Sequence, residues 1–325
     1  MQVTSVVATV RKIFRRFASL VSLLVMCCVL AAVSHAFMTV DNVMNVGRQI
    51  AEIAIMAVGQ TLVIIAGGID LSVGSVMAFS GVVTGLVLNA GGGIALGICA
   101  GLLAGSTCGA LNGFLVTKGK IPAFVVTLGM MGVASGVALV LTGGTNVFVQ
   151  NAGFGAIGLG RVLNVPVPLI IMVAVALSAH MILSRTRAGR YFYAIGGNAE
   201  SARLSGIPVG KYQGLTLLIG GLTAGLGGVL LSSRLGIAQP TAGQGYELDT
   251  IAAAVIGGAS LMGGVGTIPG TLIGAFIMAV LRNGCNLLDI SEFWQRIAIG
   301  TIVVLAVYYD HVRRRLEIVL PEETA

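Results

Sequence analysis

The chain has 325 residues, of which 56% are hydrophobic and only 10% are charged, and its formal net charge is +7. A water-soluble domain has about 25% charged residues, so this composition excludes a globular protein with a fully hydrated surface. Glycine is abundant, at 48 residues, and small residues let helices approach closely in membranes. We therefore expect an all-α, polytopic integral membrane protein that lies in a lipid bilayer and has no separate soluble domain.

Apolar runs long enough to cross a membrane recur along the whole chain. A spanning helix needs about 20 mostly apolar residues, and about ten segments meet or approach that length. They are residues 17–38, 48–67, 72–90, 93–117, 122–142, 166–184, 213–233, 249–263, 267–284 and 293–310. The eighth is short and bounded by glycine, which indicates a broken or re-entrant helix. Residues 1–325 should thus form a single transmembrane domain.

Positive charges are unevenly distributed between the expected loops. With the N-terminus inside, fourteen of the nineteen Lys and Arg residues fall in inner segments, and the other five are Arg48, Arg161, Arg234, Arg282 and Arg296. Because inner loops carry the excess of Lys and Arg in membrane proteins, both termini should be cytoplasmic. This distribution also accounts for the net charge without a nucleic-acid partner.

Two acidic residues lie near apolar runs rather than in loops, and the first is Glu52. Gln49, Glu52 and Gln60 recur at helical spacing on one face of the second expected span. Acids inside a membrane mark functional sites by default, so this face should line a cavity or the bundle interior. The alternative is that Glu52 pairs with Arg48, one turn earlier, at the membrane surface.

The second acid, Asp70, lies in the run "GGIDLSVGS" at residues 67–75. The topology places it in a cytoplasmic turn, where Asp is a strong N-cap for the helix that follows. A compatible alternative places Asp70, with Ser72, beside an inner gate where a broken helix lines a path. A similar glycine-rich turn, "GGASLMGGVGT", joins two later spans at residues 257–267.

The longest inner loop, residues 185–212, carries its own start and stop signals for a helix. Asn198 can cap a helix whose first turn holds Glu200, and Gly206 can end it at the C′ position. Glu200 and Arg203 share a face at i,i+3 spacing. Because little other soluble surface is available, we expect this helix to dock a partner. The alternative is a structured loop that only retains the topology.

The remaining polar residues show no pattern of a catalytic or metal site. The three histidines are scattered, and the five cysteines lack the CxxC spacing of a metal site. The Gly-Lys pairs that end at Lys120 and Lys211 lack the upstream glycine and the following Ser or Thr of a phosphate loop. We therefore expect no catalytic residue, no metal and no cofactor, and a chain that is not an enzyme and does not itself bind ATP.

Four segments together resemble the permease subunits of bacterial ATP-binding-cassette importers for monosaccharides, the ribose-type family. They are "AIMAVGQTLVIIAGGIDLSVGS", "TRAGRYFYAIGGNAESARLSGI", "AQPTAGQGYELDTIAAAVIGGASLMGGVGT" and "NLLDIS", and the resemblance covers about residues 17–310. It implies a multi-pass protein of the cell inner membrane that imports ribose or a similar sugar. The implied partners are a separate ATPase subunit, a periplasmic sugar-binding protein and a second permease chain, either a copy or a paralogue. An ion-coupled secondary transporter for sugars or small solutes is the alternative function.

The resemblance and the pattern of polar residues together suggest roles for particular residues. Its coupling helix, which would meet the ATPase subunit, matches the segment that contains Asn198, Glu200, Arg203, Leu204 and Gly206. Candidates for the translocation path or its gate are Gln49, Glu52, Gln60, Asp70 and Ser72. Acidic residues of a docking binding protein would meet the outer cations, foremost Arg48, Arg234 and Arg282.

Overall fold

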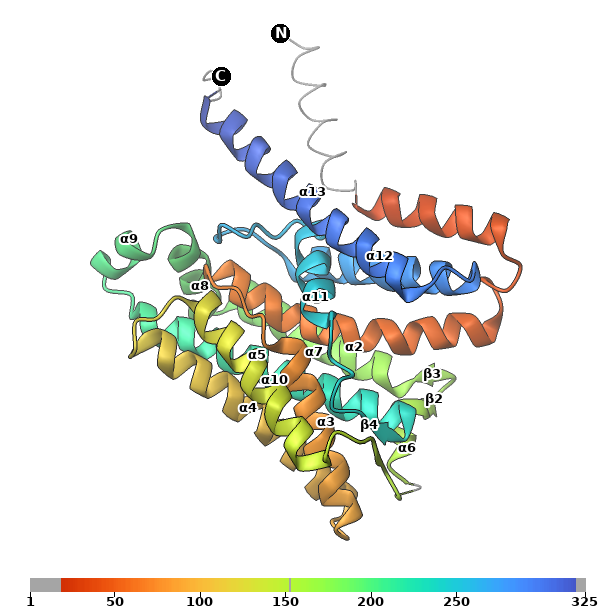
Figure 1. The fold of residues 1–325 in the computed structure, drawn as a ribbon. Coiled ribbons are helices and arrows are strands. Elements are labelled where there is room, and N and C mark those ends of the chain that lie inside the picture. The colour runs from red at the N-terminus through yellow and green to blue at the C-terminus, as the bar shows by residue number, and fades with distance from the viewer. Residues whose placement is uncertain (1–18, 152, 320–325) are drawn as a thin grey trace.

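The computed structural model describes residues 19–151 and 153–319, and helices dominate this part of the chain (Figure 1). The helices are Ser19–Val33, α2 (Val40–Ile65), α3 (Val73–Asn89), α4 (Ile94–Thr117), α5 (Ala123–Thr142), α6 (Gly155–Leu159), α7 (Val167–Arg185), α8 (Arg187–Gly197), α9 (Ala199–Leu204), α10 (Val209–Leu235), α11 (Tyr246–Ile256), α12 (Ile268–Leu287) and α13 (Glu292–Val319). Four very short strands form two antiparallel pairs: β1 (Val147–Phe148) pairs with β4 (Ile237–Ala238), and β2 (Arg161–Val162) pairs with β3 (Val165–Pro166).

Each of the ten expected segments overlaps a helix, and six of these helices are long and apolar enough to cross a membrane: α2, α4, α5, α7, α10 and α12. Ser19–Val33 and α3 are shorter apolar helices. The eighth expected segment contains α11, which has only 11 residues. The all-α, polytopic fold is thus confirmed, whereas the count of ten spans and the side of the termini stay predictions.

Helix α2 lies at the centre of the bundle. Every residue from Ile50 to Ile65 is buried, and α7, α10, α11 and α12 all pack against the helix. A helix that is surrounded in this way contacts protein rather than lipid on all sides. We therefore expect its polar residues to have hydrogen-bond partners on neighbouring helices, because burying a polar group without a partner is costly.

Helices α4 and α10 meet backbone to backbone. Gly101, Gly105, Gly109 and Gly113 recur every fourth residue and lie buried on one face of α4. A Cβ atom on Gly105 or Gly109 would collide with the main chain of α10 around Gly221. Glycine at this spacing lets helices pack closely in a membrane, where van der Waals contact drives association. This pair forms a close-packed seam, which α3 joins through the contact of Gly81 with Gly228.

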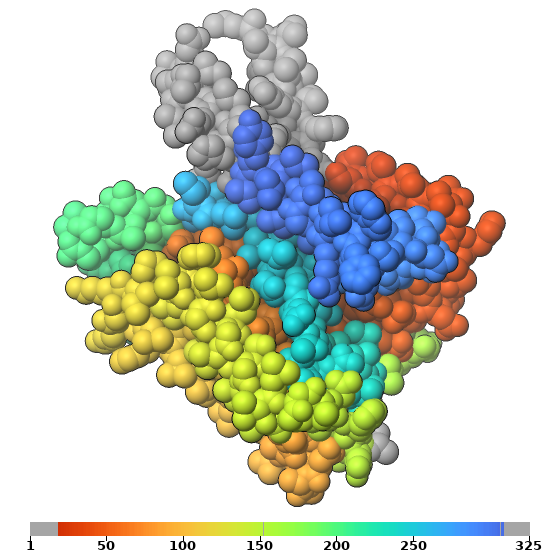
Figure 2. Space-filling model, viewed as in Figure 1, coloured from red at the N-terminus to blue at the C-terminus, as the bar shows by residue number. Residues whose placement is uncertain are grey.

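The two ends of the molecule differ in character. Helices α8 and α9 lie at one end, while α6 and strands β2, β3 and β4 lie at the other (Figure 1). We refer to them as the α9 end and the α6 end. The space-filling view shows the segment around α9 as a lobe that projects from the side of the bundle (Figure 2).

Candidate functional site

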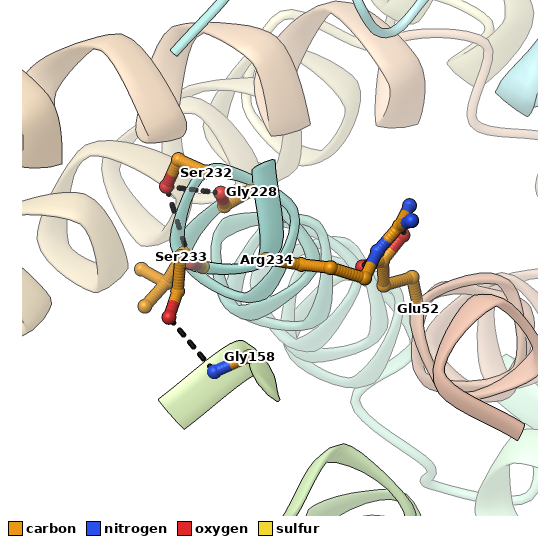
Figure 3. A network of polar contacts seen from close by, with 7 residues as sticks. Glu52, Gly158, Gly228, Ser232, Ser233 and Arg234 are labelled. Atoms are coloured by element: carbon orange, nitrogen blue, oxygen red, sulfur yellow. Dashed lines mark hydrogen bonds and ion pairs between the residues drawn. The ribbon is translucent and has the colours of Figure 1, made fainter. Parts of the chain in front are cut away.

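The polar face of α2 meets α10 in a buried ion pair near the α6 end (Figure 3). Nε of Arg234 donates to Oε1 of Glu52 at 2.7 Å, and Nη2 donates to Oε2 at 3.0 Å. Only 1% of the Glu52 side chain and 15% of the Arg234 side chain are exposed. The alternative pairing of Glu52 with Arg48 is therefore wrong, because α10 brings a better-placed guanidinium from 182 positions further along the chain. Arg48 instead donates to the carbonyl of Leu159 at 3.3 Å.

The residue before Arg234 fastens α6 to the same end of α10 (Figure 3). The backbone N–H of Gly158 donates to Oγ of Ser233 at 2.8 Å, and that hydroxyl donates to the carbonyl of Phe154 at 2.6 Å. A side chain on Gly158 would collide with the main chain of Arg234. The end of α10 is thus held from two sides, by α2 through Arg234 and by α6 through Ser233.

A second ion pair lies close by, between α11 and α12. Nη2 of Arg282 donates to Oδ2 of Asp249 at 2.6 Å, and the side chains are 28% and 0% exposed. The Arg282 guanidinium also lies 5.9 Å from the centre of the Tyr246 ring, a cation–π distance. Among the described residues, Oδ1 of Asp249 and Nε of Arg282 have no hydrogen-bond partner. Asp249 is not recognisable from the sequence, because an acid in the first turn of a helix needs no partner beyond the helix dipole.

A polar cavity of about 710 Å³ opens beside these pairs, between the ends of α10 and α12 and the starts of α11 and α13. Ligand pockets typically measure about 300–1,000 Å³. Guanidinium, carboxylate and amide groups dominate the lining: Arg234, Arg282, Arg296, Glu247, Asp249, Glu292, Gln239, Gln244 and Gln295. Such groups offer both donors and acceptors to a neutral polyhydroxylated solute.

Asp70 lies in the expected turn between α2 and α3, and this turn is buried in the bundle. Gly67, with φ +79°, turns the chain back at the end of α2, and residues 66–72 then return beside that helix. The Gln60 amide brackets the Asp70 backbone: its nitrogen lies 3.2 Å from the Asp70 carbonyl oxygen, and its oxygen lies 3.3 Å from the Asp70 nitrogen. Asp70 therefore lies beside Gln60, which is about 7.5 Å along the helix axis before the end of α2. The residue is 2% exposed. The turn is folded into the bundle because Gly67 reverses the chain, and the cytoplasmic side of this turn stays a prediction.

The Asp70 carboxylate also differs from the expected N-cap. Its Oδ1 accepts from the backbone N–H of Ser72 at 2.8 Å and from the Ser72 hydroxyl at 2.6 Å. These bonds close a turn ahead of α3, whose N-cap position is held by Ser72 without a side-chain bond. Asp70 thus shapes the entry into α3 from two residues before the N-cap.

Two further helices contribute polar groups to the same buried cluster. Nδ2 of Asn112 on α4 donates to the Ser72 hydroxyl at 3.1 Å. Oγ1 of Thr127 on α5 accepts from the Leu71 N–H at 3.1 Å and donates to the Ile69 carbonyl at 3.1 Å. Both side chains are 0% exposed. We call Gln60, Asp70, Ser72, Asn112 and Thr127 the Asp70 cluster. Asn112 is not among the residues predicted from the sequence, although an amide inside an apolar run is a usable signal.

The loop between α7 and α10 folds into two helices, α8 and α9, and the start and stop signals are confirmed. Oδ1 of Asn198 accepts from the Ser201 N–H at 2.9 Å, and Gly206 follows the helix with φ +82°. Arg203 donates to both oxygens of Glu200 at 2.6 and 2.9 Å, and this contact lowers the pKa of the Glu200 carboxyl. Leu204 is 73% exposed. The tip therefore presents an apolar side chain beside an exposed ion pair.

The three arginines expected to meet a binding protein are less free than the sequence suggests. Arg234 and Arg282 are committed to the buried ion pairs, and Arg48 is only partly exposed. Arg161 and Arg296 are exposed. Gln49 is half-buried, and the other path candidates on α2 and in the Asp70 cluster are buried.

A bundle of apolar helices with a buried polar interior and a polar cavity fits a membrane permease. The chain belongs to the family described as "Branched-chain amino acid transport system / permease component", whose model matches residues 42–307.

Its relatives include permeases of sugar transport systems. The chain is 46% identical over 297 residues to the ribose import permease protein RbsC of Escherichia coli K12, covering 90% of this chain and 92% of the relative. It is 40% identical to RbsC of Bacillus subtilis, covering 92% and 93%. It is 38% identical to the xylose transport system permease protein XylH of Escherichia coli K12, covering 86% and 87%. No solved structure matches the chain.

Proposed function

We propose that this chain is the permease subunit of an ATP-binding-cassette importer that carries a monosaccharide across the inner membrane, with ribose as the first candidate. The observation that carries this proposal is the similarity to ribose import permeases over nearly the whole chain. The polar cavity of about 710 Å³ supports it, because its lining suits a solute rich in hydroxyl groups. ATP hydrolysis would belong to a separate subunit.

The complete assembly would contain three kinds of partner. An ATPase subunit would bind at the α9 end, a periplasmic sugar-binding protein at the α6 end, and a second permease chain, a copy or a paralogue, beside this one. This arrangement requires both termini and α9 in the cytoplasm. It also requires that the short helices Ser19–Val33, α3 and α11, together with α13, complete about ten spans with the six long ones.

The path would use both polar regions. The polar cavity would receive the sugar from outside. The Glu52–Arg234 pair, with Gln49 nearby on α2, would hold the ends of α2 and α10 together beside this cavity. The Asp70 cluster, including Gln60 and Ser72, would close the inner side. Support for this role comes from its hydrogen bonds, which tie segments of α2, α3, α4 and α5 together at one level.

Reconstitution of the purified assembly in liposomes tests the function. Sugar uptake should require the ATPase subunit, ATP on the side of the membrane where that subunit binds, and a sugar-loaded binding protein. A panel of binding proteins with different sugars would identify the substrate. Sugar counterflow by this chain alone would instead favour a secondary transporter.

Charge reversal at exposed arginines should weaken docking of the binding protein. Arg161→Glu and Arg296→Glu should each raise the binding-protein concentration needed for half-maximal stimulation of the ATPase, most strongly at low salt, because rim charges act mainly on association. Arg48→Glu should act in the same direction with a smaller effect, since Arg48 is partly covered. An unchanged requirement in all three variants at low salt would contradict docking through these charges.

The stop signal of α9 should matter for binding of the ATPase subunit. Gly206 has φ +82°, and no other atom lies within 4 Å of a Cβ built there. Gly206→Val should therefore act through backbone strain alone and reduce both co-purification of the ATPase subunit and sugar uptake.

Gly206→Asn is the matched control, because Asn tolerates the left-handed conformation and should keep most co-purification. Glu200→Arg and Arg203→Glu, tested singly, report on the exposed ion pair of the same tip. Normal co-purification and uptake in Gly206→Val and in both charge variants would place the coupling surface elsewhere.

A further inference from the structure

Three separate segments meet through their main chains at the α9 end. The N–H of Gly264 donates to the carbonyl of Ile65, the last residue of α2, at 3.0 Å. The hydroxyl of Tyr193 on α8 donates to the carbonyl of Gly266 at 2.7 Å. The turn at residues 257–267 is therefore hydrogen-bonded both to the end of α2 and to α8.

Gly196, in the last turn of α8, lies at the centre of this meeting. A Cβ on Gly196 would collide with the carbonyl of Ile65 and the N–H of Gly264, the two groups that form the hydrogen bond. A Cβ on Gly263 would lie 3.0 Å from the Cα atoms of both Gly196 and Gly67. No room for a side chain remains between these backbones, so a movement of one segment toward the others must displace them.

We call this contact of the end of α8, the end of α2 and the turn at residues 257–267 the junction. It lies between α9 and the Asp70 cluster. Gly196 comes two residues before Asn198, which caps α9. On the other side, Ile65 and Gly67 lead directly into the returning segment that carries Asp70. The turn at residues 257–267 ends at Thr267, whose side chain caps α12 by accepting from the Gly270 N–H at 3.2 Å.

We propose that Gly196 is a positioning residue for transport, through which the displacement of α8 and α9 reaches the end of α2, the Asp70 cluster and the start of α12. This inference rests on the proposed function, in which α9 receives the ATPase subunit. The role of Gly196 is to keep the three main chains in contact, and it does not require contact with the sugar or with the ATPase subunit.

The neighbouring glycine provides a matched control. Gly197 belongs to the same helix, and no atom lies within 4 Å of a Cβ built on it. Alanine should be tolerated there, because Ala is the better helix former. Gly196→Ala and Gly197→Ala therefore change the same chemistry at adjacent positions and differ only in what the added methyl group meets.

The test compares both variants in the reconstituted assembly. Gly196→Ala should still co-purify with the ATPase subunit and keep its basal ATPase activity, whereas uptake per ATP hydrolysed should fall roughly fivefold or more, the lower range of coupling between sites. Gly197→Ala should match the original chain in all three measurements. Equal behaviour of the two variants, whether normal or impaired, would overturn the proposal. So would loss of co-purification in Gly196→Ala alone, since that result would assign the residue to docking.

A gentler variant keeps the proposal testable if Gly196→Ala does not fold. Tyr193→Phe removes only the hydroxyl that bonds to the Gly266 carbonyl and should lower uptake per ATP without loss of the bound ATPase subunit. Unchanged coupling in Tyr193→Phe would then count against the junction. If the original chain shows no uptake that depends on ATP and the binding protein, the proposed function itself fails, which is a separate outcome.

Discussion

Replacing Arg234 with alanine should lower the free energy of unfolding by about 3–5 kcal/mol, the usual effect of removing one partner from a buried ion pair. The reason is that the Glu52 carboxylate, 1% exposed, would remain buried without the guanidinium that now contacts both its oxygens. The thermal unfolding midpoint of the detergent-purified protein measures the effect, together with the yield of monodisperse protein.

Two comparisons make this result specific. Arg296→Ala removes an exposed guanidinium that lines the same cavity, and it should leave the midpoint nearly unchanged. The double variant Glu52→Gln with Arg234→Met removes both charges and should recover much of the loss, because a buried ion pair is often replaceable by neutral groups of similar volume. If Arg234→Ala unfolds at the same temperature as Arg296→Ala, the pair does not support the fold.

Asp70→Leu should reduce the amount of folded protein strongly. The substitution removes the acceptor shared by the N–H and the hydroxyl of Ser72, and each buried polar group left without a partner costs roughly 1–3 kcal/mol. Asp70→Asn keeps an oxygen at the same position, so it should fold and should retain most sugar uptake per folded molecule. Quantitative membrane expression and uptake, measured on the same samples, separate folding from transport.

The two Asp70 variants also distinguish the shape of the residue from its charge. If Asp70→Asn reaches the normal level in the membrane and yet transports nothing, the negative charge itself acts in transport. That outcome would contradict the structural role argued for the Asp70 cluster. Asn112→Leu offers a parallel test, since it removes the amide that donates to Ser72 and alters no charge.

The sequence predicts best those features that depend on neighbours along the chain. The apolar runs predict the helices, and Asn198 and Gly206 predict the start and end of α9, because capping uses backbone groups within a few residues. Partners across the bundle are different. Nothing near Glu52 indicates Arg234, 182 positions away, and the pairing of Asp249 with Arg282 spans 33 positions.

The position of Asp70 shows the same limit in another form. The glycine pair at residues 67 and 68 correctly indicates a turn, but local signals do not say how far back along α2 the chain returns. That depth is set by contacts with Gln60, Asn112 and Thr127, which come from three different helices. Polar residues inside apolar runs were therefore recognisable individually, whereas their assembly into one cluster required the fold.

The glycine seam between α4 and α10 bears on which parts of the protein can move independently. Because Gly105 and Gly109 bring the two backbones together without intervening side chains, rotamer changes cannot open a gap between these helices. We expect α4, α10 and the adjoining α3 to move as one rigid unit during a transport cycle. Motion within this unit should then be smaller than the motion of the whole unit relative to the rest of the protein. Nitroxide spin labels on α4 and α10 should accordingly keep a fixed separation in every state of the cycle.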